Sequence, residues 1–347
     1  MKLQQKKFEY RDIMVPIFSV VLALLIGSLF IILAGENPLT AYRVLFMESL
    51  VGVNSLARTL QRATPLVFTG MAVAFAFRCG LFNIGGEGQL YLGAFASAWV
   101  GFALTGLPRI IHLPLAVAAG MLAGALWGAI PGILKARLGV HEVINTIMMN
   151  FIAYYLTDYL VTGPFQGPRW SPETERVAPT AALSRLLPPT RLTTGFFLAL
   201  LIVVLIFFLL YKTRLGYEIR AVGFNPLAAE YGGISVSRNI VLAMAISGGL
   251  AGLAGAEQIL GLHGRFIQRF SPELGFIGIA VALLGKNHPV GVLLAALLFG
   301  ALRTGGAAMD RMTAVPRELI VIIQALIIIF VAADELIRPF LRRKEGL

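Results

Sequence analysis

A stripe of polar residues interrupts one long apolar run of this sequence. Asn83, Glu87 and Tyr91 follow one another at four-residue spacing, and Gln89 lies between the last two. If the helix is continuous there, the first three share one face. Polar side chains inside an apolar span are costly, so we expect this face to look inward, away from lipid.

A second polar stripe is longer. Thr146, Asn150, Tyr154 and Asp158 are again four residues apart, so the stripe turns by about 40° per step around the helix. Both stripes consist mainly of amides, hydroxyls and phenols, with few charges. Such groups suit the path of a neutral solute that forms hydrogen bonds and has a ring that can stack. The alternative is that these groups bond one another between helices and never touch a solute.

Two carboxylates, Glu87 and Glu257, lie deep in the apolar runs. They suit either a proton relay or the capping of backbone groups freed by nearby glycines, and we favour capping. His141, at the end of an apolar run, is expected at the membrane interface rather than on a metal. No H-E-x-x-H motif and no Cys/His spacing occurs, so no metal site is expected.

The composition indicates an all-α polytopic membrane protein. Hydrophobic residues make up 57% of the chain and charged residues 14%. The net charge of +11 comes from basic residues at the ends of apolar runs, which favours contact with the lipid bilayer over nucleic acid. Cys79 is the single cysteine, so no intrachain disulfide forms. The run 14–34 exceeds a signal-peptide core and lacks a clear cleavage site, so we expect a retained first helix.

The apolar runs predict about ten transmembrane helices in a single domain, residues 14–333. The expected spans are 14–34, 63–77, 80–105, 112–134, 142–162, 193–211, 239–262, 272–285, 289–302 and 318–333. An even number of spans places both tails, 1–13 and 334–347, on one side, which we expect to be the cytoplasm. The loops 35–62 and 163–192 then lie outside. The second, rich in proline, is expected to be an irregular cap with one short amphipathic helix, or a mere connector.

The runs 272–285 and 289–302 are too short to cross the membrane as straight helices. Their glycine-rich sequence suggests broken or re-entrant helices. A second interrupted region, CGLFNIGGEGQ, lies at the start of the span 80–105. Spans two to five and seven to ten are offset by an odd number of crossings. The topology therefore predicts inverted halves, a transporter pattern with the substrate path between them.

Glycines recur at every fourth position in two spans. The first stripe is Gly120, Gly124, Gly128 and Gly132, and the second contains Gly248 and Gly252. Such stripes of small residues let helices pack closely in lipid, so these positions are expected to serve helix packing and not chemistry.

The charged segment 212–238 stands out in the middle of the chain, and its four basic residues indicate the cytoplasm. Asn225 can cap a helix whose first position is Pro226, and the glycines after Tyr231 can end it. A helix of under two turns is not stable alone, so it must be held by something it packs against. We interpret it as a docking helix for a cytoplasmic partner, the alternative being an ordinary inter-helix loop.

No G-x-x-x-x-G-K-[ST] phosphate loop occurs in the sequence. If ATP powers this protein, another chain must bind the nucleotide.

Several motifs in order resemble the permease subunits of bacterial ABC importers for simple sugars and nucleosides, the branched-chain amino acid/ribose-type permease family. They are FRCGLFNIGGEGQLYLGAF, HEVINTIMMNFIAYYL, GYEIRAVGFNPLAAEYGGI, ISGGLAGLAGAEQILG and GFIGIAVALLGKNHPVG. The F-N-I-G-x-E-G-Q form resembles the nucleoside branch, which works with a basic-membrane-protein lipoprotein as its receptor. Asn83, Glu87 and Gln89 match that signature.

The resemblance implies a type II importer fold in the bacterial cytoplasmic membrane. It implies three partners: a second homologous permease, a tandem-domain ATP-binding protein that holds ATP and Mg²⁺, and an extracellular solute-binding lipoprotein. The loop matching 223–234 would dock on the ATPase. The residues expected to couple to it are Arg220, Asn225, Pro226, Leu227, Ala229 and Glu230.

The function expected from these observations is nucleoside import by a subunit that is not itself an enzyme and holds no cofactor. Three alternatives stay open. The same machinery can carry a simple sugar. A stand-alone ion-coupled carrier would use Glu87, Asp158 or Glu257 as its coupling group. An intramembrane enzyme is the most distant, because no pair of nucleophile and base is evident.

Overall fold

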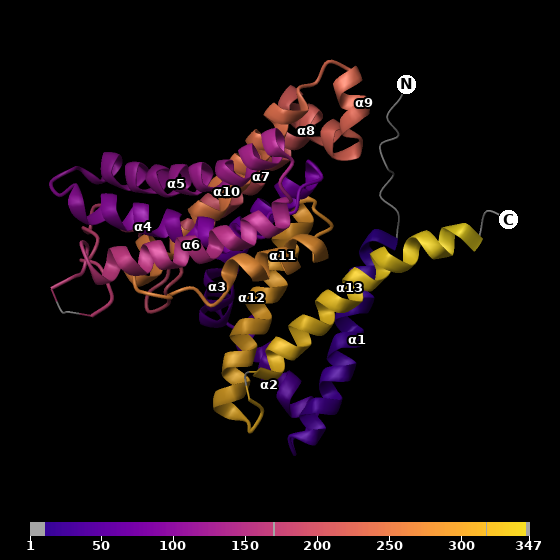
Figure 1. The fold of residues 1–347 in the computed structure, drawn as a ribbon. Helices are drawn as coiled ribbons and strands as arrows, with labels where there is room; N and C mark the ends of the chain where they lie inside the picture. Colours follow the sequence, from indigo (N-terminus) through magenta and orange to yellow (C-terminus); the bar gives the residue numbers. More distant parts are fainter. Residues whose placement is uncertain (1–10, 169–170, 317, 345–347) are drawn as a thin grey trace. The chain divides into compact units, whose positions relative to one another are not determined.

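The computed structural model describes residues 11–168, 171–316 and 318–344, and helices account for most of them (Figure 1). In chain order the helices are α1 (Arg11–Leu33), α2 (Pro38–Leu50), α3 (Val53–Arg78), α4 (Gly86–Ala103), α5 (Arg109–Leu138), α6 (Glu142–Thr162), α7 (Gly195–Lys212), α8 (Arg214–Phe224), α9 (Pro226–Tyr231), α10 (Val236–Glu257), the π-helix η1 (Gln258–His263), α11 (Leu274–Leu284), α12 (Pro289–Met312) and α13 (Glu318–Lys344). They form two compact units, one from Ala57 to Gly300 and the other from the described residues on either side.

The larger unit is organised around α4, α5 and α10, which run side by side in Figure 1. The glycine stripes of α5 and α10 face each other. A methyl group added to Gly124 would overlap the carbonyl oxygen of Gly248, and one added to Gly252 would overlap that of Gly120. Backbones this close leave no room for a side chain, which is the packing that the spacing of the glycines predicts.

The smaller unit is held by contacts between α1, α2, α12 and α13. Gly27 of α1 lies against Ile323 of α13, and Gly305 of α12 lies against Leu45 of α2. Tyr42 donates a hydrogen bond from its hydroxyl to the carbonyl oxygen of Leu24. These contacts join the first and last helices of the chain in one packed group.

Five helices of the described residues are long and apolar enough, by length and composition alone, to cross a membrane: α3, α5, α7, α10 continued by η1, and α12. Shorter apolar stretches lie in α1, α11 and α13. Each of the ten expected spans overlaps one of the helices, α1, α3 to α7 and α10 to α13, in agreement with an all-α polytopic protein.

Several expected boundaries were wrong. Residues 35–62 hold α2 and the start of α3 instead of a loop, because Asn37 caps a helix that begins at Pro38. The ninth span is not short, since α12 runs for 24 residues. The described residues between 163 and 194 contain no helix, so the amphipathic helix expected there is not found. The tail 334–347 continues α13 to Lys344, and most of the tail 1–13 lies outside the described residues.

Candidate functional sites

The break between α3 and α4 carries a buried network of side chains. Asn83 precedes α4 instead of lying on it, so the expected single face with Glu87 and Tyr91 was wrong. The Asn83 amide nitrogen donates to Gln89 Oε1 at 2.9 Å and to Ser247 Oγ at 2.8 Å, and Gln89 Nε2 donates back to Asn83 Oδ1 at 3.1 Å. Asn83 and Gln89 are almost fully buried. The two amides therefore join the break to α10.

Two residues of the second stripe hold the backbone of this break. Gly88 donates its amide to Asn150 Oδ1 at 2.7 Å, and Asn150 Nδ2 donates to the carbonyl oxygen of Ile84 at 3.0 Å. Thr146 Oγ1 accepts from the amide of Ile84 at 3.3 Å. Irregular backbone at membrane depth needs such partners because lipid supplies none. Thr146 and Asn150 bind protein groups here, and their contact with a solute stays a prediction.

Glu87 joins α4 to the start of α11. Its Oε2 accepts a hydrogen bond from the amide of Gly275, in the first turn of α11, and its side chain is buried. The first amides of a helix have no partner inside the helix, so a carboxylate there completes their bonding. This is the capping role expected for Glu87. Glu257 differs, because its Oε2 accepts from the side-chain amide of Gln258 at 2.7 Å.

Replacing Glu87 by alanine is expected to destabilise the larger unit by about 1–3 kcal/mol, because the Gly275 amide is left buried and unpaired. Glu87→Gln keeps an oxygen that can accept this bond, so its thermal midpoint and its transport should stay close to wild type. Thermal unfolding in detergent and uptake by the assembled protein measure both. Loss of uptake in Glu87→Gln with an unchanged midpoint would assign the carboxylate to proton transfer instead.

The second half of α6 meets the irregular segment 264–273. Asp158 forms an ion pair with Arg269 at 2.8 Å, and the Arg269 guanidinium carbon lies 4.3 Å from the centre of the Tyr154 ring. Tyr154 contacts Tyr91 edge to face at 4.9 Å, and Tyr91 contacts Phe270 at 5.0 Å. The structure thus brings Tyr91, Tyr154 and Asp158 together around Arg269.

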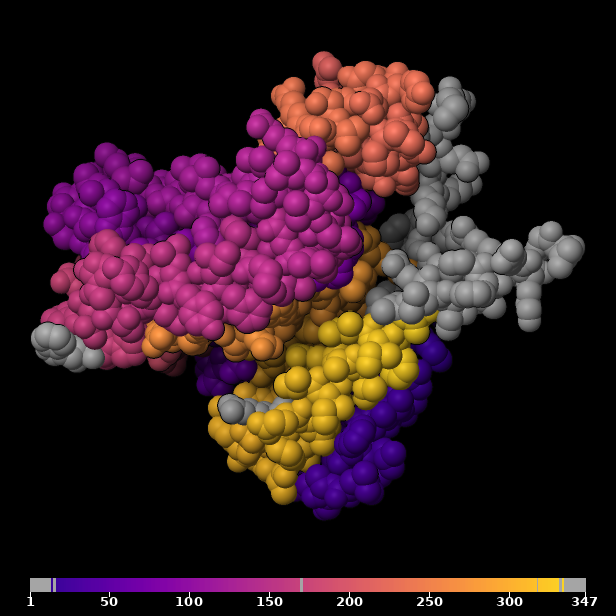
Figure 2. Space-filling model, in the orientation of Figure 1, coloured from indigo at the N-terminus to yellow at the C-terminus, as the bar shows by residue number. Residues whose placement is uncertain are grey.

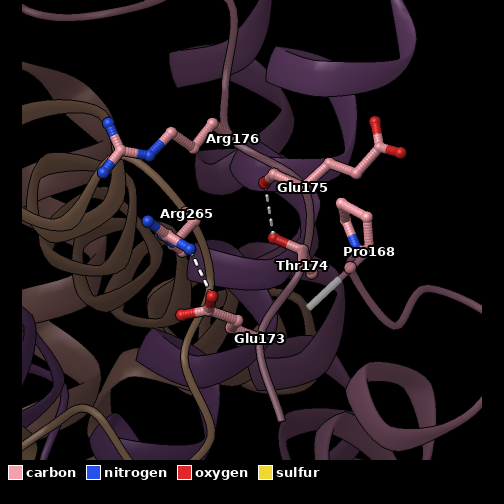
Figure 3. Close-up of a pocket in the computed structure, with 7 residues that line it drawn as sticks. Pro168, Glu173, Thr174, Glu175, Arg176 and Arg265 are labelled. Atoms are coloured by element: carbon pink, nitrogen blue, oxygen red, sulfur yellow. Dashed lines mark hydrogen bonds and ion pairs between the residues drawn. The ribbon is translucent and has the colours of Figure 1, made fainter. Parts of the chain in front are cut away.

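A cavity of about 310 Å³ lies where the chain after α6 meets the chain after η1 (Figure 3). Arg265 and Glu173 form an ion pair beside it, and Figure 3 shows the guanidinium groups of Arg176 and Arg265 on the same side. The lining residues are Gly167, Pro168, Glu173, Thr174, Glu175, Arg176 and Arg265. The cavity lies beyond η1, at the end of α10 that is away from α8 (Figure 1).

The segment 212–238 forms a helical hairpin of α8 and α9 (Figure 1). Asn225 caps α9 by accepting from the amide of Ala228 at 3.0 Å, and Pro226 is its first residue, as expected. The hairpin exposes large apolar side chains: Phe224 is 82% exposed, Leu227 70% and Tyr231 95%. Exposed apolar groups this close together are typical of a protein-binding surface.

The expected coupling residues do not all lie on that surface. Asn225, Pro226, Leu227 and Glu230 are exposed. Ala229 is buried and packs α9 in place. Arg220 is only partly exposed, with its guanidinium 5.3 Å from the Tyr211 ring. These two residues therefore help to pack the hairpin and are not part of its exposed surface.

A chain of contacts leads from the hairpin to the buried network. A methyl group on Gly223 of α8 would overlap the carbonyl oxygen of Arg78, the last residue of α3. Arg78 Nε donates to the carbonyl oxygen of Asn287 at 2.8 Å, in the turn between α11 and α12. The other end of α11 is bonded to Glu87. Helix α11 thus spans from the hairpin end of the unit to the break in α3–α4.

Several residues that are prominent in this geometry do not stand out in the sequence. Phe224 and Tyr231 are exposed on the hairpin, Ser247 completes the buried network, and Arg269 pairs with Asp158. One signal was available for Arg269: Arg265, Arg269 and Glu273 follow at four-residue spacing between two apolar helices.

Three relatives are similar to this chain over nearly its full length. It is 43% identical to the guanosine ABC transporter permease protein NupP of Bacillus subtilis, over 94% of each chain. It is 38% identical to the nucleoside ABC transporter permease protein NupB of Lactococcus lactis, over 97% of this chain and 95% of the relative. It is also 38% identical to the glucose ABC transporter permease protein TsgB13 of Haloferax volcanii, over 94% and 88%.

The two bacteria also have a second, less similar permease named for the same kind of transporter. NupQ of Bacillus subtilis is 29% identical over 70% of this chain, and NupC of Lactococcus lactis is 28% identical over 71%. No solved structure matches the chain. The model of one family, the permease component of branched-chain amino acid transport systems, matches residues 55–332. With this match and the full-length relatives, the chain belongs to that permease family.

Proposed function

We propose that this chain is a membrane subunit of an ATP-binding cassette importer that carries nucleosides into a bacterial cell. The similarity to two permeases named for guanosine and nucleosides, at 43% and 38% identity, supports this proposal most directly. The aromatic group around Arg269 agrees with a neutral solute that has a ring. The chain itself carries no catalytic residue in this scheme.

The proposed assembly has four kinds of component. A second permease is supported by NupQ and NupC, which accompany NupP and NupB in the same organisms. A separate tandem-domain ATPase would hold ATP and Mg²⁺ and bind the exposed hairpin from the cytoplasm. An extracellular solute-binding lipoprotein would dock at the opposite end, where the charged cavity lies. With an even number of spans, both termini would also lie in the cytoplasm.

The contacts of the hairpin suggest how ATP-driven motion reaches the solute. Closure of the ATPase would tilt α8 and α9, whose backbone touches the end of α3 at Gly223. Arg78 would pass this movement to the turn at Asn287, and α11 would carry it to Glu87. Because packed interfaces have discrete arrangements, a small tilt can switch access between the two sides.

One other function has some support, and another is disfavoured. TsgB13 is named for glucose, so the same machinery can serve a simple sugar. A stand-alone ion-coupled carrier is disfavoured, because Glu87 caps α11 and Asp158 is paired with Arg269.

One experiment separates the three functions. The chain is purified by affinity from its native membrane, the complex is reconstituted in vesicles, and uptake of guanosine, ribose and glucose is measured with ATP inside or with a pH gradient alone. A co-purifying ATPase and ATP-dependent guanosine uptake are expected. Uptake of a hexose alone would replace the nucleoside by a sugar, and uptake driven by the pH gradient without an ATPase would overturn the importer.

A further inference from the structure

The segment 264–273 exposes charged side chains next to α6. The side chain of Arg269 is 46% exposed, and Glu273 is exposed as well. Tyr155 of α6, 6.0 Å from Arg269, is 68% exposed. Among the described residues, the Glu273 carboxylate forms no ion pair or hydrogen bond. We refer to Tyr154, Tyr155, Arg269 and Glu273 as the charged face, and Figure 2 shows orange atoms of this part of the chain along the edge of the magenta α6 surface.

This face lies at membrane depth. Gly88 is bonded to Asn150, which is about 12 Å from the start of α6 and about 18 Å from its end at 1.5 Å per residue. Glu87 is adjacent to Gly88 and is bonded to Gly275, two residues after Glu273. Helix α11 has 11 residues and is about 16 Å long, so Glu273, which precedes it, lies within about 16 Å of the hairpin end of the unit, less than the thickness of a bilayer. Arg269, paired with Asp158, lies about 6 Å from the end of the helix.

The backbone is strained at both charged residues. Arg269 has a φ of 53° and Glu273 a φ of 62°, in the left-handed region that side chains other than glycine rarely adopt. Such conformations cost about 1–3 kcal/mol each and persist where the surroundings or the function require them. Glu273 directly precedes α11, which is the helix that links the hairpin to Glu87.

Hydrocarbon cannot cover this face. An exposed carboxylate and irregular backbone at membrane depth occur only where they are buried in protein or line a water-filled cavity. The exposed face of α7 is different, because side chains such as Leu201 and Phe208 make it apolar and suited to lipid. The charged face must then meet water or another protein. The unpaired carboxylate favours water and a ligand, since burying it in a protein interface would require a partner charge.

We infer that the charged face is one wall of the solute path and binds the sugar ring of the solute there. This rests on the proposed import function and names residues for it. The Glu273 carboxylate accepts hydrogen bonds from two adjacent ring hydroxyls, a pattern that carboxylates favour. Arg269 donates to a ring oxygen, and Tyr155 offers a flat ring on which a base or the sugar face stacks. The ligand class is a neutral solute with a vicinal diol, as in ribose.

Cysteine labelling tests where the face lies. Cys79 is the single cysteine and is 3% exposed, so variants are made in a Cys79→Ala background that retains uptake. Glu273→Cys and, as a lipid-facing control, Leu201→Cys are treated in the assembled complex, from both sides, with a charged, membrane-impermeant thiosulfonate. Glu273→Cys is expected to react at least about tenfold faster, because thiolates form only in contact with water. It should also react more slowly when guanosine is present. Equal, slow reaction of both cysteines would overturn the path assignment.

A specificity measurement tests the ligand. In Glu273→Gln, the KM for guanosine uptake is expected to rise about tenfold, because one charge-assisted hydrogen bond to the solute is lost. The KM for 2′-deoxyguanosine, which lacks the diol, should change little. Asp310→Asn, an exposed carboxylate on α12, is the matched control and should leave both values unchanged. Equal changes for both nucleosides, or none, would contradict binding of the diol.

Failure of the proposed function gives a different result. If the wild-type complex imports a hexose and no nucleoside, the nucleoside proposal falls. If the thiosulfonate then labelled Glu273→Cys more slowly in the presence of that hexose, the charged face would still lie in the path.

Discussion

Replacing Gly124 by valine is expected to prevent stable packing of the larger unit. The added Cβ would overlap the carbonyl oxygen of Gly248 and would approach the backbone of Gly252. These are backbone atoms of α10, so no flexible side chain can move aside, and the two helices must separate. Overpacking of a well-packed core destabilises a protein by about 1–3 kcal/mol per site. We expect Gly124→Val to cost about 3 kcal/mol or more.

The measurement is the amount of monodisperse protein extracted from the membrane, together with its thermal midpoint. Leu126→Phe is the matched control, because Leu126 lies on the exposed side of the same helix and is 70% exposed. The control should keep wild-type yield and midpoint, and Gly124→Val should lose most of both. A Gly124→Val protein as stable as the control would mean that α5 and α10 do not approach as closely as the structure has them.

The features that could be predicted from the sequence are those set by local chemistry. Glycine at every fourth position puts small residues on one side of a helix whatever surrounds it, so the α5–α10 contact follows from spacing. The start of α9 follows in the same way, because Asn225 can bond a free amide and Pro226 needs no amide partner. Both patterns act within a few residues of chain.

The features that could not be predicted depend on contacts far apart in the sequence. Four-residue spacing predicts that Asn83 lies on a helix, because the spacing assumes a continuous helix. The chain is irregular there, and its backbone is bonded by Thr146 and Asn150 of α6. The side chain of Arg220 lies against Tyr211, at the end of another helix. Exposure of Phe224 and Tyr231, and of Arg269 and Glu273, is also decided by neighbours that no local pattern identifies. Of the residues expected to line the substrate path, Thr146 and Asn150 bond the backbone of the break, and contact of either with a solute stays a prediction.

Removing the two apolar side chains of α9 is expected to release the proposed ATPase subunit. In the double variant Leu227→Ala/Tyr231→Ala, the exposed surface of the hairpin loses the groups that a partner groove would bury. Interface hot spots of this kind cost about 2 kcal/mol each, so the loss of both should weaken ATPase binding by about 1,000-fold. Uptake should be lost with it, because no other nucleotide site is proposed in the complex.

The folded chain itself should be unaffected, since both side chains are exposed while Ala229 and the Asn225 cap, which hold α9, are untouched. Affinity purification of the variant with quantification of the bound ATPase measures the effect, and the thermal midpoint of the chain shows that it is still folded. Tyr159→Ala, which removes an aromatic ring that is 67% exposed on α6, is the matched control and should retain the ATPase. If the double variant retained the ATPase as well as the control does, the hairpin would not be the docking surface, and energy from ATP would have to reach α11 and the charged face by another route.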